Sequence, residues 1–191
     1  MAVAFALYQT QLGACALVWQ GQGEAGVLAS LLPGADETAL RATVACRFAG
    51  AVEAPMPPSI ADAAARVTRL LAGQVADHRE LLTVPLDPAG WAQLGDFERA
   101  TLQLTREIPV GQTRTYGELA ALLGQPGAAR AVGLAESRNP FAPIVPCHRV
   151  MGAGGAPTGF SAPGGVETKR RLLLVEARAA GQLAGDQQPL F

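Results

Sequence analysis

The chain is poor in lysine, cysteine, histidine and aromatic residues, and each shortage narrows what it can be. Lys169 is the one lysine among 15 basic residues, and aromatic residues make up 5% of the 191 positions. Three cysteines and two histidines are too few and too scattered for a disulfide framework or a closed zinc site. We therefore expect a reducing compartment and neither a metal nor another cofactor. These five residues are Cys15, Cys46, Cys147, His78 and His148.

Long apolar runs are also lacking. No run approaches the ~18 residues that a membrane span needs, and no basic segment of the kind found in secretion signals precedes the first apolar residues. The expected location is cytoplasmic, without a membrane partner, and we expect a monomer.

An excess of charge of one sign is missing from the chain as a whole. The 15 basic and 16 acidic residues give a net charge of -1, which by itself argues against a nucleic-acid partner. Residues 97–176, however, carry nine basic and six acidic residues, whereas the remainder carries six and ten. The second half is positive by three, so DNA stays open as its partner.

The length, with 49% hydrophobic residues, favours one domain of ordinary size or two small ones. Pro85, Pro88 and Gly90 punctuate the chain and predict a division into residues 1–90 and 91–191. The first part is expected to be a small α/β or α+β unit. Its β-favouring runs and helical periodicities predict strands over 2–8, 14–19, 26–32 and 80–86, a helix over 37–48 capped by Asp36, and a helix over 60–71.

Three helices are predicted in the second part, over 97–108, 116–123 and 127–138. Thr115 is expected to cap the second of them, and Gly124 and Pro126 end it. Two short helices joined by a tight turn outline a helix-turn-helix, which is typical of DNA-reading modules and also of plain helical hairpins. The pattern alone leaves both interpretations open.

Residues 143–150 read Pro-Ile-Val-Pro-Cys-His-Arg-Val. The two prolines restrict the backbone before Cys147, as a rigidly held nucleophile requires. A thiolate is the reactive form of cysteine, and we expect His148 or Arg149 to lower its pKa. The alternative is a small buried side chain without reactivity. Cysteine-protease chemistry fits poorly, because its Cys and His are normally far apart in sequence, and only His78 could then serve.

Several motifs in the second half, in this order, closely resemble the O6-alkylguanine-DNA alkyltransferases, also called methylated-DNA–protein-cysteine methyltransferases. The resemblance is dense from about Phe97 to Glu176 and loose before that. The matching stretches are IPVGQT at 108–113, YGELA at 116–120, AARAVG at 128–133, Asn139-Pro140, and PCHRV at 146–150.

The family resemblance implies an α+β chain. Its N-terminal domain would be ribonuclease H-like α/β, and its C-terminal domain winged-helix-like, with a helix-turn-helix. The implied activity is DNA repair: an alkyl group passes from O6-alkylguanine in double-stranded DNA to the protein's own cysteine, after the nucleotide is flipped out. O4-alkylthymine is left open as a second substrate. Since the thioether is stable, each molecule would act once.

The resemblance also assigns roles to residues. Cys147 matches the alkyl acceptor, and Glu176, His148 and a water match the chain that activates it. Asn139 matches the residue that orders the active-site turn.

Further residues match the family's contacts to DNA and base. Arg130 matches the arginine that fills the vacated place in the base stack, and Tyr116 matches a tyrosine that crowds the 3′ phosphate and assists protonation of the leaving guanine. Phe160 would offer a stacking face and Ser161 a hydrogen bond near O6. The backbone at Cys147 and Val150 would read the exocyclic amine.

The chain departs from the family pattern at two sites. Phe160 lacks the hydroxyl of the common tyrosine, and an inserted Ala162-Pro163 follows Ser161. Both departures put substrate breadth in doubt. Glu136 adds an acid to the recognition helix, so we expect modest nonspecific DNA affinity. Cys15 and Cys46 are expected in the core.

Two other functions are kept open. One is an alkyltransferase-like protein that binds the lesion without accepting the alkyl group, against which Cys147 speaks. The other is a sequence-specific regulator that uses the helix-turn-helix alone.

Overall fold

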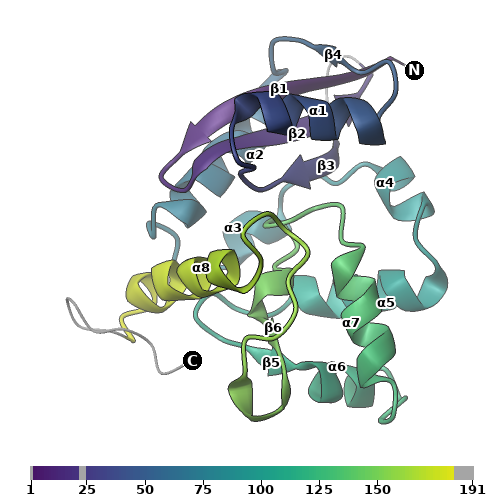
Figure 1. The fold of residues 1–191 in the computed structure, drawn as a ribbon, viewed down its shortest axis with the longest axis vertical. Coiled ribbons are helices and arrows are strands. Elements are labelled where there is room, and N and C mark those ends of the chain that lie inside the picture. The colour runs from purple at the N-terminus through teal and green to yellow at the C-terminus, as the bar shows by residue number, and fades with distance from the viewer. Residues whose placement is uncertain (1, 22–24, 183–191) are drawn as a thin grey trace.

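In a computed structural model, which describes residues 2–21 and 25–182, a four-stranded sheet with helices on both faces is followed by a mainly helical part (Figure 1). The predicted combination of a small α/β unit with a helical C-terminal part is confirmed. Residues 1, 22–24 and 183–191 lie outside the description. The first residue of the predicted N-terminal domain and the last residues of the predicted C-terminal domain are therefore not described.

Strands β1 (Val3–Thr10) and β2 (Gly13–Gln20) form an antiparallel hairpin, and β3 (Val27–Leu31) pairs with the other edge of β2. These are the first three predicted strands. Gly13, at the hairpin turn, has φ +122°, a conformation that L side chains rarely adopt. A strand that was not predicted, β4 (Val52–Glu53), pairs in parallel with β1 and completes the order β3-β2-β1-β4.

Helices α1 (Glu37–Arg47) and α2 (Pro58–Leu71) cover opposite faces of the sheet. Alternate residues of β2 separate the two layers. Cys15, Leu17 and Trp19 lie in the core beneath α2, whereas Ala16 and Val18 lie in the core beneath α1. The predicted cap of α1 is confirmed, because the side chain of Asp36 accepts a hydrogen bond from the backbone N–H of Ala39 at 2.7 Å.

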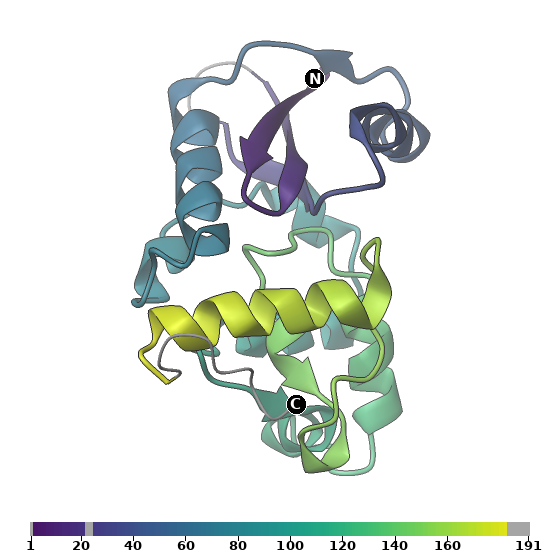
Figure 2. The same cartoon turned by 60° about the vertical axis from the view of Figure 1, so that its left-hand side comes forward.

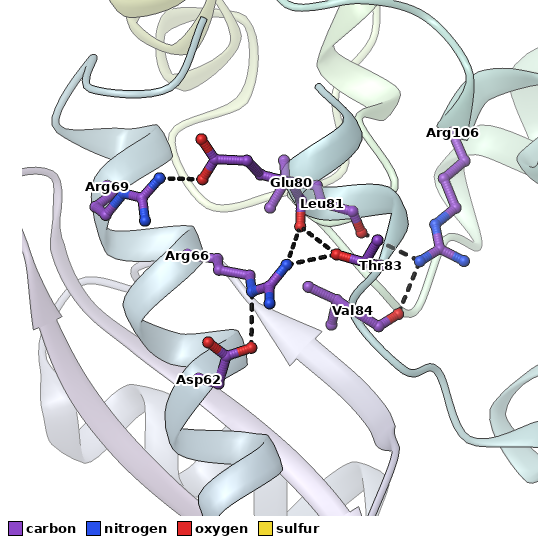
Figure 3. Close-up of polar contacts among 8 residues, drawn as sticks. All are labelled: Asp62, Arg66, Arg69, Glu80, Leu81, Thr83, Val84 and Arg106. Atoms are coloured by element: carbon purple, nitrogen blue, oxygen red, sulfur yellow. Dashed lines mark hydrogen bonds and ion pairs between the residues drawn. The ribbon is translucent and has the colours of Figure 1, made fainter. Parts of the chain in front are cut away.

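The strand predicted over 80–86 is wrong. Residues 79–82 form a short helix, α3 (Arg79–Leu82), and only Leu86 makes an isolated bridge, to Val27. Side chains of neighbouring helices bind the carbonyls that a strand would have used (Figure 3). The guanidinium of Arg66 on α2 donates to the carbonyl of Glu80 at 2.7 Å. Arg106 donates to the carbonyls of residues 81, 82 and 84.

The helices predicted in the second part are confirmed with slightly shorter bounds. Thr115 caps its helix, since its Oγ1 accepts from the N–H of Glu118 at 3.1 Å. The remaining elements are α4 (Pro88–Ala92), α5 (Asp96–Arg106), β5 (Arg114–Thr115), α6 (Tyr116–Leu122), α7 (Ala129–Ser137), the 3-10 turn η1 (Cys147–Arg149), β6 (Val150–Met151), the 3-10 turn η2 (Ala153–Gly155) and α8 (Gly165–Ala179).

Helix α8 runs between the sheet part and the helical part (Figure 2). It packs against α2, and its Leu172 belongs to the same apolar core as Leu17 and Ile60. That core includes residues from both sides of the predicted boundary at residue 90. Among the described helices, none is long and apolar enough to cross a membrane.

Candidate active site

Cys147 is held at the end of a tightly bonded loop that leads from α7 to η1. The side chain of Asn139 bridges this loop: its Nδ2 donates to the carbonyl of Val145 at 2.7 Å, and its Oδ1 accepts from the N–H of Phe141 at 2.9 Å. The loop is tied to β3, because the N–H of Ser30 donates to the carbonyl of Pro140 at 2.8 Å. The thiol therefore sits on a support that both halves of the chain fix.

Phe141 anchors the same loop from below. Its side chain is fully buried, and its ring centroid lies 5.0 Å from that of Trp91 on α4. Gly90 leaves the room for it: a Cβ at that position would lie 2.7 Å from Cζ of Phe141 and 2.7 Å from the carbonyl oxygen of Leu28. A side chain at residue 90 would displace the loop that carries the cysteine.

A cavity of about 750 Å³ opens in front of Cys147. Its walls come from the start of α6, from one face of α7, from η1 and from the segment 153–161. Four of the other residues expected at the site line it, namely Tyr116, Arg130, Phe160 and Ser161. A second, smaller cavity of about 350 Å³ shares Cys147, Phe160 and Ser161 with it and is also lined by Asn139.

Behind the cysteine, three charged or ionisable side chains form a buried network. Glu176 on α8 is 2% exposed, and its Oε1 lies 2.8 Å from Nε2 of His148. Arg149 donates from Nε to Oε2 of Glu176 at 2.8 Å and from a terminal nitrogen to Oε1 at 2.7 Å. Another guanidinium nitrogen of Arg149 donates to the carbonyl of Ile108. The structure thus brings Glu176 of α8 into contact with His148 of η1, the residue next to Cys147.

The charges of this network are set by burial and by neighbouring groups. Burial lowers the pKa of His148, so the imidazole is neutral at physiological pH. Burial opposes the ionisation of Glu176, but the interactions with His148 and Arg149 outweigh it and lower the pKa of Glu176 to about 2. A neutral imidazole that donates from Nε2 to Glu176 keeps Nδ1 as an acceptor. Nδ1 is buried and has no hydrogen-bond partner among the described residues.

The free thiol is not activated in the way the sequence suggests. Burial, followed by the charge of Glu136, raises the pKa of Cys147 to about 12, while Asn139 and Lys169 act in the opposite direction. The prediction that His148 or Arg149 lowers the pKa of this thiol is wrong, because both side chains face Glu176. Any activation requires a proton acceptor at the moment of reaction.

Sequence reasoning missed Lys169. Its side chain is fully buried, and its ammonium donates to the carbonyls of Val150, Thr158 and Gly159 at 2.5, 3.1 and 3.3 Å. It also lies 5.6 Å from the ring centroid of Tyr116. A lone lysine in a chain that otherwise uses arginine was a signal, but nothing in the sequence places it beneath the cavity.

Two expectations about acidic and thiol side chains are corrected. Glu136 is 5% exposed and turns into the cavity wall, so it does not add negative charge to the outer face of the recognition helix. The exposed residues of α7 are uncharged or basic: Arg130, Ala131, Leu134 and Ser137 within the helix, with Arg138 at its C-cap. Cys15 is buried as expected, but Cys46 is exposed in the last turn of α1, so its assignment to the core is wrong.

The other residues expected to contact DNA or base are placed as follows. The hydroxyl of Tyr116 donates to the carbonyl of Thr158 at 3.1 Å, and burial, followed by the charge of Glu136, raises the pKa of Tyr116 to about 12. Val150 is fully buried behind the cavity wall and its carbonyl accepts from Lys169. Within residues 2–21 and 25–182, no three His, Cys, Asp or Glu side chains gather as a candidate metal site.

Comparison with known proteins identifies relatives of this chain. Residues 96–178 match the family model described as the DNA binding domain of 6-O-methylguanine DNA methyltransferase. The chain is 42% identical over 122 residues to the methylated-DNA–protein-cysteine methyltransferase of Mycolicibacterium paratuberculosis, covering 64% of this chain and 68% of that protein. It is 45% identical over 109 residues to the protein of the same name from Methanosarcina acetivorans, covering 57% of this chain and 66% of that protein.

Solved structures extend the similarity over more than nine-tenths of the chain. The crystal structure of Mycobacterium tuberculosis OGT in complex with DNA superposes with a TM-score of 0.71 at 32% identity, covering 93% of this chain and 94% of that one. The O6-methylguanine-DNA methyltransferase of Pyrococcus kodakaraensis gives a TM-score of 0.61 at 26% identity, covering 91% and 98%. This chain therefore belongs to the methylated-DNA–protein-cysteine methyltransferase family.

Proposed function

We propose that this chain repairs DNA by moving an alkyl group from O6-alkylguanine to Cys147 in one irreversible step. The observation that carries the proposal is the placement of Cys147 in the wall of a cavity between the two helices of a helix-turn-helix and the segment 153–161. A volume of about 750 Å³ lies within the ~300–1,000 Å³ typical of small-molecule sites. Membership of the alkyltransferase family supports the same reaction.

The reaction needs a proton acceptor for the thiol. Nδ1 of His148 has a free lone pair when Nε2 donates to Glu176, so it can take the proton of Cys147, directly or through one water. The charge that then forms on the imidazole faces the carboxylate of Glu176 at 2.8 Å. His148 thus acts as the base, and Glu176 positions it and stabilises its charged form.

The transfer itself is a displacement at the alkyl carbon. The sulfur of Cys147 forms a bond to that carbon while the bond from the carbon to O6 breaks, and the electron pair passes to the guanine. Tyr116 lines the cavity, and its hydroxyl, which donates to the carbonyl of Thr158 in the free protein, supplies a proton to the departing base. The proton that His148 took from Cys147 then returns to Tyr116 through solvent, so the thiol proton ends, in net terms, on the guanine. The product is a thioether on Cys147, and the protein is not regenerated.

Access to the alkyl group requires that the nucleotide leave the base stack. Arg130 lies on the exposed face of α7 at the edge of the cavity, so it can occupy the place that the flipped base leaves. Phe160 would stack on the base inside the cavity, and Ser161 would donate to O6. Double-stranded DNA carrying the lesion is the partner that we propose.

Two other functions make different predictions. A lesion-binding protein without transfer would bind the alkylated duplex equally well after Cys147→Ala and would never take up the alkyl group. A sequence-specific regulator would prefer one operator sequence and ignore the lesion. The cysteine in the cavity wall speaks against the first, and the similarity to methylated-DNA–protein-cysteine methyltransferases speaks against the second. Monomeric action, a cytoplasmic location and the boundary at residue 90 stay predictions.

The proposal is tested by single-turnover transfer from a duplex that carries O6-methylguanine with a labelled methyl group. We expect label on the protein with a limit of one methyl group per molecule, and none on the Cys147→Ser variant. Binding of the alkylated duplex by that variant is the control for DNA recognition. Turnover beyond one methyl group per molecule, or full transfer by Cys147→Ser, would reject the mechanism.

A further inference from the structure

Glu136 is a buried carboxyl in the wall of the reactive cavity that the mechanism above does not use. It lies on the recognition helix α7, is 5% exposed, and lines the same cavity as Cys147 and Tyr116. Its Oε1 contacts the hydroxyl of Thr105 on α5 at 2.5 Å. Its Oε2 is buried and has no hydrogen-bond partner among the described residues. An ionised carboxylate in this setting would be poorly compensated.

The hydroxyl of Thr105 indicates that the carboxyl carries a proton in the free protein. Its Oγ1 lies 3.0 Å from the carbonyl of Thr101 and 2.5 Å from Oε1 of Glu136. A hydroxyl has one hydrogen, so Thr105 cannot donate to both oxygens at once. A protonated Glu136 resolves this conflict, since its own hydrogen is donated to Oγ1 while Thr105 donates to the helix carbonyl. Oε2 is then a carbonyl oxygen rather than part of a charge.

We propose that Glu136 sets the upper pH limit for use of Cys147, because a negative charge formed on this carboxyl opposes the thiolate in the cavity that both residues line. Glu136 is thus a positioning residue that acts through the thiol. The inference rests on the proposed function only in taking Cys147 as the alkyl acceptor.

The direction of the effect follows from the titration of the carboxyl. Burial raises the pKa of Glu136 to about 8 and outweighs the opposite effect of the charge of Lys169. Below pH 8 the carboxyl is neutral, and the thiolate fraction of Cys147 grows tenfold for each pH unit. Above pH 8 the carboxyl ionises, and the like charge suppresses further thiolate formation.

Other titratable groups face the same region, and the test must separate them from Glu136. The charge of Glu136 acts to raise the pKa of Tyr116 on α6 and of Cys147 on η1. The charges of Cys147 and Glu136 act to raise the pKa of Lys169 on α8. The hydroxyl of Thr105 is the polar contact from α5. Deprotonation of Lys169 would also disfavour the thiolate at high pH, but Glu136→Gln leaves that lysine in place.

The experiment measures alkylation of Cys147 by iodoacetamide between pH 6.5 and 9.5, with peptide mass spectrometry to separate it from Cys15 and Cys46. In this reaction the thiolate displaces iodide, and no DNA is needed. For the wild type, the logarithm of the rate should rise to about pH 8 and then flatten. For Glu136→Gln it should keep rising. The alkylation rates of the two proteins should therefore agree near pH 7, and the variant should react up to about tenfold faster at pH 9.

One further variant serves as the matched control. Glu167→Gln changes an exposed carboxylate of α8 and should leave the profile unchanged. A wild-type profile without a bend, or the same bend in Glu136→Gln, overturns the inference.

The outcome is independent of repair activity. If methyl transfer from DNA fails while the iodoacetamide profiles differ as described, the proposed function is wrong and the inference about Glu136 holds. If methyl transfer occurs and the profiles coincide, the proposed function holds and the inference about Glu136 is wrong. Should the Glu136→Gln variant not fold, a wild-type profile without a bend still overturns the inference.

Discussion

Replacing Glu176 by glutamine keeps the shape of this side chain and removes the negative charge that faces Arg149 and His148. The pKa of Glu176 falls from an ordinary value of 4.5 to about 2 in the folded protein. That difference corresponds to about 3 kcal/mol of folding free energy at neutral pH. Loss of one partner of a buried ion pair costs ~3–5 kcal/mol, which agrees in magnitude. We therefore expect Glu176→Gln to lower the free energy of unfolding by about 3 kcal/mol at pH 7.

The pH dependence gives this prediction its sign. A carboxyl whose folded pKa is depressed stabilises the fold above its unfolded pKa, and this contribution is lost as the pH falls toward the folded pKa. The difference in the free energy of unfolding between wild type and Glu176→Gln should therefore be constant from pH 7 to about pH 5.5 and shrink below about pH 4.5. Urea unfolding of both proteins at pH 7, 5.5, 4.5 and 3.5 measures it.

Glu167→Gln on the same helix is the matched control, because its carboxylate is exposed and at the 4.0 Å limit of an ion pair with Arg170. It should change the free energy of unfolding by less than about 0.5 kcal/mol. Equal stability of Glu176→Gln and wild type at pH 7, or a deficit that does not change with pH, would refute the electrostatic reasoning.

Three further predictions concern the supports of the site. Arg130→Ala should slow transfer from duplex O6-methylguanine about 5- to 150-fold through the loss of ~1–3 kcal/mol of stacking, and leave the reaction with the free base O6-benzylguanine unchanged. Gly90→Ala should cost about 1–3 kcal/mol in urea unfolding, because its Cβ would meet Leu28 and Phe141. Asn139→Ala removes two hydrogen bonds of the active-site loop and should cost ~1–3 kcal/mol, with slower iodoacetamide labelling if the loop stays folded.

Local pattern was sufficient for much of the fold. Strands β1 to β3 and helices α1, α2, α5, α6 and α7 follow from β-favouring runs, helical spacing and the caps at Asp36 and Thr115. Residues 80–86 were misjudged because Arg66 and Arg106, which bind the carbonyls there, come from helices that the sequence does not place nearby (Figure 3). Two-residue β4 has too few residues to show any period.

The candidate site divides in the same way. The motif around Cys147 pointed to the cysteine and to His148. The family resemblance assigned the partner Glu176, whose Oε1 α8 brings within 2.8 Å of Nε2 of His148. The inward position of Glu136 could not be predicted, because it depends on how α7 rotates against α5, where Thr105 meets it. The high pKa of Cys147 comes from burial among segments distant in sequence.

The most direct test of the central claim is to find which atom of the protein carries the methyl group after reaction with O6-methylguanine duplex DNA. Intact-protein mass spectrometry followed by peptide mapping should show one added CH₂ on the peptide that contains Cys147, and unmodified Cys15 and Cys46. No adduct with the lesion persisting, or a methyl group on either of the other cysteines, would contradict the account.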